Sequence, residues 1–188
     1  MPDTDQQIVE ACQRGDPAAF EGLVRLYGSS VLGYLTRLCG DRDRAEDCFQ
    51  ETFGRVYRNL HQVRPVAFRA WLFRIATNTA IDGFRRQNRV KMTSLDQTAE
   101  GENPGAARDA IVDLLPGPAE AASRKEQVEA VRRAVASLPD GQRAALVLAY
   151  YQKMSYSQVA EVLGCSVGTV KIQMSRALAT LAGRLPDV

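Results

Sequence analysis

The stretch SYSQVAEVLGCSVGTVKIQMSRALATL, residues 155–181, decides the fold of the C-terminal part of the chain. Ser155 and Gln158 form a Ser-x-x-Gln capping box, which predicts the start of a helix, and Gly164 predicts its end. Ser166 predicts the N-cap of a second helix. Two helices joined by so short a turn predict a helix-turn-helix. This motif indicates DNA binding when Lys and Arg side chains crowd its second helix, although tight helical turns also occur in proteins that never contact DNA.

The two faces of the second helix differ in chemistry. At 3.6 residues per turn, one face collects the apolar side chains that we expect in the core: Val170, Met174, Ala177, Leu178 and Leu181. The first helix offers Val159, Ala160 and Leu163 to pack against them. The opposite face is polar and basic, and its candidate DNA contacts are Thr169, Lys171, Ile172, Gln173, Ser175 and Arg176. In a recognition helix such a face lies in the major groove, where Lys and Arg side chains can bind phosphates or the edges of guanine.

Ile172 interrupts this polar face with a bare aliphatic side chain. An isoleucine can pack on the C5-methyl group of thymine, which is the one apolar contact that the major groove offers. The alternative is that Ile172 packs on another domain or on an inhibitory protein. Single exposed isoleucines are common in proteins, so both interpretations stay open.

The rest of the chain also has a helical period, and no segment alternates for long like a strand, so we expect an all-α fold. Asp16-Pro17 predicts a helix start and Gly40-Asp41 predicts the end of that helix and the cap of the next. A third helix is expected over residues 68–89, with a core face made of Phe68, Trp71, Leu72, Ile75, Ala76 and Thr79. Two more are expected over residues 123–138 and 141–152, on either side of Pro139.

Charge is distributed unevenly around a net value of +2. Residues 1–91 carry 14 Lys and Arg against 11 Asp and Glu, residues 92–122 carry one against six, and residues 123–188 carry nine against five. The middle segment is also rich in Gly, Pro and small residues, which predicts an extended acidic linker. We therefore expect two small helical domains, 1–91 and 123–188, with the helix-turn-helix in the second.

Composition argues against several other kinds of protein. The four cysteines have no CxxC spacing and His61 is the only histidine, so we expect no metal site and reduced thiols in a cytoplasmic protein. Cys165, in the helix-turn-helix turn, is either a redox switch or, as we favour, a small buried packing residue. The N-terminus is not a signal peptide and the longest apolar run, residues 144–151, is too short to span a bilayer, so no membrane insertion is expected. No phosphate loop or nucleophile constellation is present, so we expect neither enzymatic activity nor a cofactor.

Three blocks, in this order and spacing and with an acidic linker before the third, resemble an extracytoplasmic-function (ECF) sigma factor of the bacterial sigma-70 family. They are DRDRAEDCFQETFGRVYRNL at 41–60, FRAWLFRIATNTAIDGFRRQNR at 68–89, and LPDGQRAALVLAYYQKMSYSQVAEVLGCSVGTVKIQMSRALATL at 138–181. The resemblance implies a subunit that binds core RNA polymerase and reads promoter DNA. The C-terminal domain would read the −35 duplex, and the N-terminal domain would help to open and hold the −10 element. ECF sigma factors are often held by an anti-sigma factor, which makes such an inhibitor a candidate partner.

In the first block, the resemblance implies a polymerase-binding helix. Asp47, Gln50 and Glu51 lie at i, i+3 and i+4 and form one polar face, while Cys48, Phe49, Thr52 and Val56 can face the core. In the family this polar face docks on a coiled coil of the β′ subunit, and the C-terminal domain contacts the β flap. Arg55 and Arg58 are further candidates for the same surface. Without the resemblance, a solvated face would be the ordinary interpretation.

In the second block, the resemblance implies contacts to −10 DNA by Arg74, Asn78, Asp82, Arg85, Arg86 and Arg89. Together with the loop at residues 61–66, this helix would capture single-stranded bases flipped out of the duplex, which need pockets and stacking surfaces. Trp71 could stack on such a base, but its position on the wheel favours core packing. The alternative for the arginines is a solvated surface. The range from Arg69 to Lys91 carries six Lys and Arg against one Asp, which argues against that alternative.

The chain departs from the family at residues 172 and 173. After Gly-Thr-Val-Lys the family usually continues with Ser-Arg, whereas here Ile172-Gln173 follows. The −35 sequence that this protein reads is therefore expected to differ from the usual element. In the family the acidic linker threads polymerase channels that normally hold nucleic acid, and a solvated tether is the alternative.

Two other classes of protein fit parts of the pattern. A stand-alone helix-turn-helix regulator would make little use of the polar face at Asp47, and would bind duplex DNA tightly and salt-sensitively by itself. A helical protein-interaction module would leave the arginines of residues 74–89 merely solvated.

Overall fold

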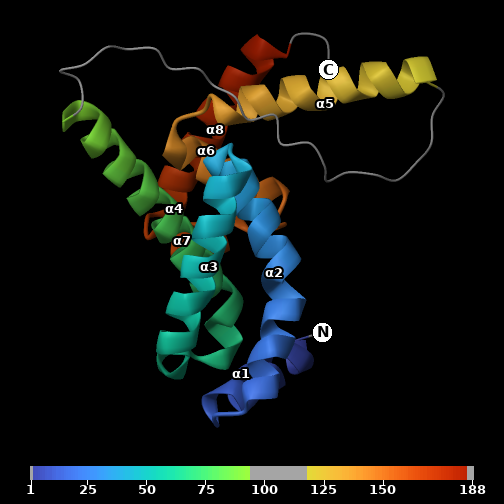
Figure 1. Ribbon diagram of the computed structural model, residues 1–188. Helices are drawn as coiled ribbons and strands as arrows, with labels where there is room; N and C mark the ends of the chain where they lie inside the picture. Colours follow the sequence, from blue (N-terminus) through green and yellow to red (C-terminus); the bar gives the residue numbers. More distant parts are fainter. Residues whose placement is uncertain (1, 94–117, 186–188) are drawn as a thin grey trace.

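The computed structural model describes residues 2–93 and 118–185, with side chains placed for residues 5–85 and 126–185. Within these ranges the protein is all-α, as predicted, and contains no strand. The elements are α1 (Pro2–Gln13), α2 (Pro17–Cys39), α3 (Arg42–Asn59), η1 (Leu60–Gln62), η2 (Pro65–Ala67), α4 (Phe68–Thr93), α5 (Pro118–Ala136), α6 (Asp140–Tyr150), α7 (Tyr156–Leu163) and α8 (Val167–Arg184). Helices α2, α3 and α4 run side by side with α1 across one end, and α5 and α6 lie toward the other end (Figure 1).

The helix ends lie where short-range signals predict them. Asp16 caps α2 by accepting a hydrogen bond from the Ala18 N–H at 2.9 Å, and Asp41 caps α3 in the same way from Arg44 at 2.9 Å. The capping box of Ser155 and Gln158 is complete in both directions. Gly164 ends α7 with φ of +64°, in the left-handed region that a side chain makes costly.

Helices occupy both ends of the range 92–122, where we expected only a linker. α4 continues to Thr93 and α5 begins at Pro118 rather than at residue 123. Pro118 has a favourable place there, because the first position of a helix needs no backbone N–H. The remainder of the predicted linker lies outside the described residues.

Burial follows the predicted faces, with one exception. Val170, Met174 and Ala177 of α8 are buried, but Leu178, which we expected in the core, is 42% exposed. Leu178 lies at the edge of the apolar stripe, about 100° around the helix from Ala177, whereas Ala177 and Leu181 face the core and are buried and half-buried. In α4 the core also takes Phe73 and Thr77, whose hydroxyl lies 2.7 Å from the Tyr34 hydroxyl.

The C-terminal helices pack directly on the N-terminal bundle: α7 lies along α4, and α6 along α2. Gln152, in the turn between α6 and α7, is only 7% exposed. Its side-chain carbonyl accepts from the Ser30 hydroxyl at 2.7 Å and its amide donates to the Ser30 carbonyl at 3.2 Å. Arg69 donates to the Gln152 backbone carbonyl, and Arg37 lies over the Tyr151 ring at 4.3 Å from its centroid. This turn therefore joins the two halves of the protein.

Candidate nucleic-acid and protein interfaces

The outer face of α8 is open to solvent. Thr169, Lys171, Ser175 and Arg176 are exposed, and so is Ile172 at 55%. Ser166 caps the helix through the Thr169 N–H at 3.0 Å, and the two hydroxyls lie 2.9 Å apart. The cap therefore fixes the first turn of α8, which carries Thr169.

Gln173, the sixth candidate on α8, is only half-exposed because its side chain packs against the start of α6. A Cβ built on Gly141 would lie 3.2 Å from the Gln173 amide nitrogen, so a glycine at this position leaves room for the glutamine. Gln173 therefore helps to fix α8 on α6, a contact that the sequence pattern did not reveal.

The candidate −10 residues on α4 divide into two groups. Arg74, Asn78 and Arg85 are exposed along one side of the helix. Asp82 is half-buried, and its carboxylate lies 3.9 Å from the guanidinium of Arg55 on α3. The side chains of Arg86 and Arg89 lie outside the described residues.

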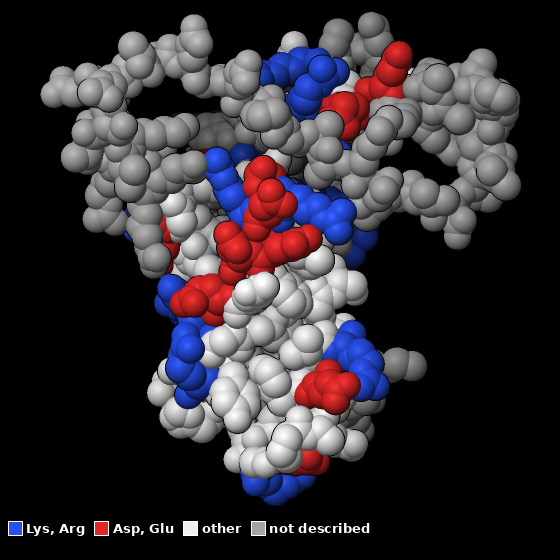
Figure 2. Space-filling view, viewed as in Figure 1, with Lys and Arg blue, Asp and Glu red and all other residues white. Residues whose placement is uncertain are grey.

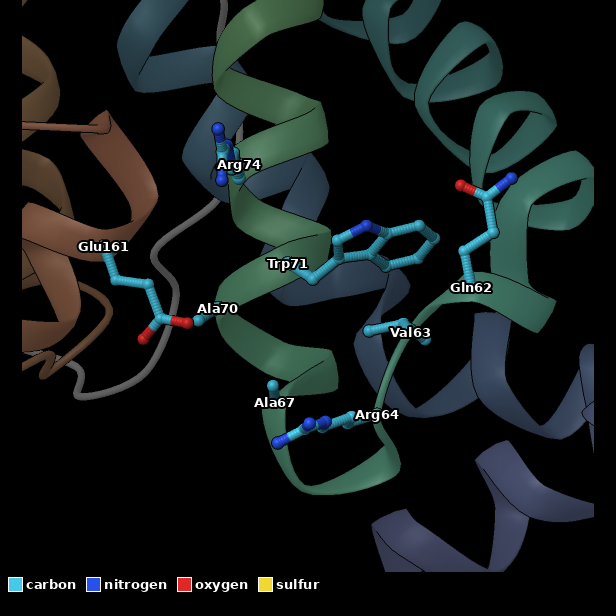
Figure 3. A pocket seen from close by; sticks show the side chains of 8 residues that line it. All are labelled: Gln62, Val63, Arg64, Ala67, Ala70, Trp71, Arg74 and Glu161. Carbon is cyan, nitrogen blue, oxygen red and sulfur yellow. The ribbon is translucent and has the colours of Figure 1, made fainter.

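A cavity of about 160 Å³ opens beside this helix. It is lined by Gln62, Val63, Arg64, Ala67, Ala70, Trp71, Arg74 and Glu161. Figure 3 shows the Trp71 indole between α4 and the segment that carries Gln62 and Val63, while Glu161 approaches from α7. Trp71 also contacts Phe68, with ring centroids 5.9 Å apart. Trp71 therefore packs partly against the core and also lines the cavity.

The wall of the cavity is held in place from α1. The Gln13 side-chain amide donates to the backbone carbonyls of Leu60 and Val63, at 3.0 and 2.8 Å. The loop predicted to capture bases is thus two short 3-10 turns, η1 and η2, fixed at their junction. Nothing in the local sequence around residue 60 identifies Gln13 as its anchor.

The predicted polar face of α3 is formed: Asp47, Gln50 and Glu51 are exposed, and Thr52 and Val56 on the opposite side are buried. Figure 2 shows acidic side chains gathered over α3, with Lys and Arg at their edges. Arg55 donates to Glu51 at 2.7 Å, and Arg58 lies 3.9 Å from the same carboxylate. Both arginines therefore pair with a carboxylate of the acidic face and do not form a separate basic patch.

One buried cation escaped the sequence analysis. Arg143 on α6 is buried, donates to the Ala136 carbonyl at 2.9 Å and to Asp140 at 2.6 Å, and lies 5.5 Å from the centroid of the Phe84 ring on α4. Only Asp140 among these partners lies on the same helix, and the contacts to Ala136 on α5 and Phe84 on α4 depend on the tertiary fold. Cys165 is half-buried and packs against the core, as the packing alternative predicts.

Within the described ranges, no three His, Cys, Asp or Glu side chains are grouped so that they could hold a metal ion. None of the described helices combines the length and the apolar character needed to cross a bilayer.

An exposed basic face on a helix-turn-helix, together with an Arg- and Asn-bearing helix beside a cavity, is typical of a helical DNA-binding protein. Residues 23–90 match the family model for sigma-70 region 2, and residues 128–181 match the one for sigma-70 region 4. The chain therefore belongs to the sigma-70 family of RNA polymerase sigma factors, in its ECF group.

Two relatives are similar to this chain over nearly its full length. The chain is 38% identical to RNA polymerase sigma-H factor of Pseudomonas aeruginosa over 92% of this chain and 89% of that protein. It is 36% identical to ECF RNA polymerase sigma-E factor of Haemophilus influenzae, over 93% and 91%.

Two solved structures resemble the whole fold. CnrH, in complex with the cytosolic domain of CnrY, matches with a TM-score of 0.68 at 28% identity over 98% of this chain and 99% of that chain. The sigma factor RpoE of Bartonella quintana, in complex with the anti-sigma factor NepR, matches with a TM-score of 0.70 at 24% identity over 89% and 97%, which shows the shared fold alone.

Proposed function

We propose that this sigma factor uses three separate faces to direct RNA polymerase to promoters. α3 holds the polymerase, α8 reads the −35 duplex, and α4 with its cavity holds −10 DNA. The N-terminal part (1–91) and the C-terminal part (123–188) act as separate modules tethered through the segment between them. The protein acts in the cytoplasm and performs no covalent chemistry of its own.

The cavity beside Trp71 is the observation that carries the −10 assignment. Three kinds of contact that an unstacked base needs converge there: an aromatic face from Trp71, a side-chain amide from Gln62, and a guanidinium from Arg74 for the backbone phosphate. Asn78 and Arg85 lie further along the exposed side of α4, where the neighbouring nucleotides would follow. Seven of the eight lining residues lie between Gln62 and Arg74, so most of the cavity would remain if α7, which carries Glu161, moved away.

The −35 assignment is supported by the exposure of Ile172 between basic and hydroxyl-bearing neighbours on α8. Lys171 and Arg176 would hold phosphates or guanine edges, and Thr169 and Ser175 would bond bases or phosphates. Gln173 contributes from the edge of the face, because its side chain also packs on α6.

The polymerase assignment is supported by the exposed carboxylates of Asp47 and Glu51 beside Gln50, which would dock on the β′ coiled coil. The C-terminal domain would contact the β flap. An anti-sigma factor is a further proposed partner, because RpoE of Bartonella quintana, which shares this fold, was solved with the anti-sigma factor NepR. CnrH, which resembles this chain over its full length, was also solved with a bound protein, the cytosolic domain of CnrY.

Run-off transcription with purified core polymerase and a promoter library tests this proposal. We expect promoter-specific transcripts with the wild-type protein, and their loss in the double variant Asn78→Ala/Arg85→Ala. The variant should still bind core polymerase, because α3 is unchanged.

The matched control is Arg25→Ala, which removes an exposed arginine from α2, away from the proposed DNA contacts. It should transcribe as the wild type does. The proposal is wrong if the wild-type protein and core polymerase initiate at no specific site, or if the double variant keeps full promoter-specific transcription.

A further inference from the structure

The cavity beside Trp71 has two walls that come from different elements. One wall belongs to α4, where the Trp71 ring packs on Phe68, a core residue, with ring centroids 5.9 Å apart. The other wall is the segment from η1 to η2, which contributes Gln62, Val63 and Arg64 (Figure 3). Each of these two 3-10 turns is only three residues long, so they supply few hydrogen bonds of their own. The position of this second wall therefore depends on contacts from elsewhere in the fold.

Gln13 supplies such a contact through its side-chain amide. The amide nitrogen donates to the Leu60 carbonyl at 3.0 Å and to the Val63 carbonyl at 2.8 Å. A primary amide has two N–H donors, so these two bonds use both of them. The Leu60 carbonyl also accepts from the Val63 N–H at 3.3 Å, so the amide binds both ends of the turn that begins the second wall. Leu60 and Val63 are only 5% and 8% exposed, so a side chain without donors would take a partner from the carbonyls of two buried residues, which is costly.

The end of α1 holds Gln13 in a fixed place. Gly15 has φ of +87°, in the left-handed region that commonly ends a helix, and the Asp16 N–H donates to the Ala11 carbonyl at 3.2 Å. Val9, one turn before Gln13, is fully buried, and α1 packs against α2, η1 and η2. Gln13 therefore links the second wall of the cavity to a helix that the core itself positions.

We propose that Gln13 is a positioning residue for −10 recognition. By fixing two carbonyls of the loop, its amide sets the spacing between the wall that carries Gln62 and the Trp71 ring, so that an unstacked base fits between them. Gln13 does not line the cavity, so it acts through the backbone and not by touching DNA. It also lies outside residues 23–90, the part of the chain that matches sigma-70 region 2. The role of Gln13 rests on the proposed function, which assigns the cavity to −10 DNA.

The test uses polymerase holoenzyme and a promoter from the run-off library, with its −10 region opened by mismatches. Each non-template base of that region is removed in turn to leave an abasic site, and electrophoretic mobility shifts give the Kd. We expect the wild type to lose affinity at least about fivefold at one captured base, the effect of one stacking contact. In Gln13→Met, which keeps the approximate length of the side chain and removes both donors, that loss should shrink to less than about twofold, because the wall no longer holds the base against Trp71. Losses at the other positions and the −35 preference should be unchanged.

A second readout uses the full-length protein without DNA or polymerase. Trp71 is the single tryptophan of the chain, so its fluorescence reports on the cavity alone. Acrylamide should quench this fluorescence more strongly in Gln13→Met than in the wild type, because the second wall is no longer fixed. The matched control is Gln7→Met, at an exposed glutamine of the same helix, which should behave as the wild type in both measurements. Gln13→Lys, which restores N–H donors, should recover the wild-type behaviour in both.

The role of Gln13 is overturned by any of three results. These are a wild-type loss at one base that Gln13→Met keeps in full, unchanged quenching in Gln13→Met, or an equal change in Gln13→Met and Gln13→Lys, since the donors would then not matter. A wild type without any position-specific loss would instead contradict the −10 assignment itself and remove the basis of this role, so the two failures are distinguishable. Gln13→Glu, which has the size of glutamine but no N–H donor as a carboxylate, replaces Gln13→Met if circular dichroism shows that the methionine variant does not fold.

Discussion

At the scale of single residues, Ile172 is the most informative side chain on α8. It is 55% exposed in the middle of a face that otherwise carries hydroxyl and charged groups. Leu178, on the same helix, is also exposed at 42%, but it lies at the edge of the apolar stripe whose centre, at Met174 and Ala177, is buried. Two exposed aliphatic residues on one helix thus have different physical explanations, and they can serve as test and control.

Removing the thymine methyl group and the isoleucine side chain in turn tests the proposed contact. We expect Ile172→Ala to weaken binding to a duplex carrying the preferred −35 sequence by about 1 kcal/mol, with lost preference at one thymine. Replacing that thymine by uracil should weaken the wild type by a similar factor and the variant hardly at all. Electrophoretic mobility shifts with the polymerase holoenzyme measure both.

Leu178→Ala is the control, and its base preference should match that of the wild type. An Ile172→Ala protein that still distinguishes thymine from uracil at every position would exclude the methyl contact and favour a role for Ile172 against a protein.

At the scale of elements, α3 has two faces with separate tasks. Thr52 and Val56 are buried, while Asp47 and Gln50 project into solvent without a packing role. Arg55 bridges α3 and α4 through Glu51 and Asp82, which fixes the acidic face relative to α4. Changes on the exposed face should therefore affect partner binding and leave the fold intact.

Reversing one charge on α3 tests this division. We expect Asp47→Lys to lower the affinity for core polymerase at least about tenfold, or about 1.4 kcal/mol, because a carboxylate contact becomes a repulsive one. Its unfolding free energy should stay within about 0.5 kcal/mol of the wild type, as for other exposed positions. Titration of core polymerase by fluorescence anisotropy and urea denaturation measure the two quantities.

The control is Glu10→Lys, an equal charge reversal at an exposed position of α1. An Asp47→Lys protein with unchanged polymerase affinity, alongside an unchanged control, would remove α3 from the proposed interface.

At the scale of the whole molecule, the two halves are too close together for the promoter contacts that we propose. α7 packs against both α4 and α8, so the two helices proposed to bind DNA lie within about 20 Å at ordinary helix spacings. The −35 and −10 elements are about 25 base pairs apart by their names, or about 85 Å at 3.4 Å per base pair. The proposed function therefore requires the Gln152 contact to open.

Gln152→Ala tests how firmly this contact closes the free protein. The substitution removes two hydrogen bonds to Ser30, so we expect small-angle X-ray scattering to show a larger radius of gyration than for the wild type. Gln50→Ala, an exposed glutamine on α3, is the matched control and should leave the radius unchanged. Identical scattering curves for Gln152→Ala and the wild type would mean that other contacts hold the halves together.

Much of the protein could be predicted because its signals are local. Caps such as Asp41 and Ser155 act on N–H groups three residues away, and the helix period places Asp47, Gln50 and Glu51 on one face whatever surrounds them. The polar faces of α3 and α8 are therefore properties of the sequence by itself.

Only the tertiary structure decided which side chains meet across distant segments. Gln152 pairs with Ser30, 122 residues away, and Gln13 anchors a loop 47 residues away. The cavity beside Trp71 and the partial burial of Gln173 depend on how neighbouring helices pack. No local pattern reports such contacts, because the free energy that selects them comes from packing between helices rather than from the period within one.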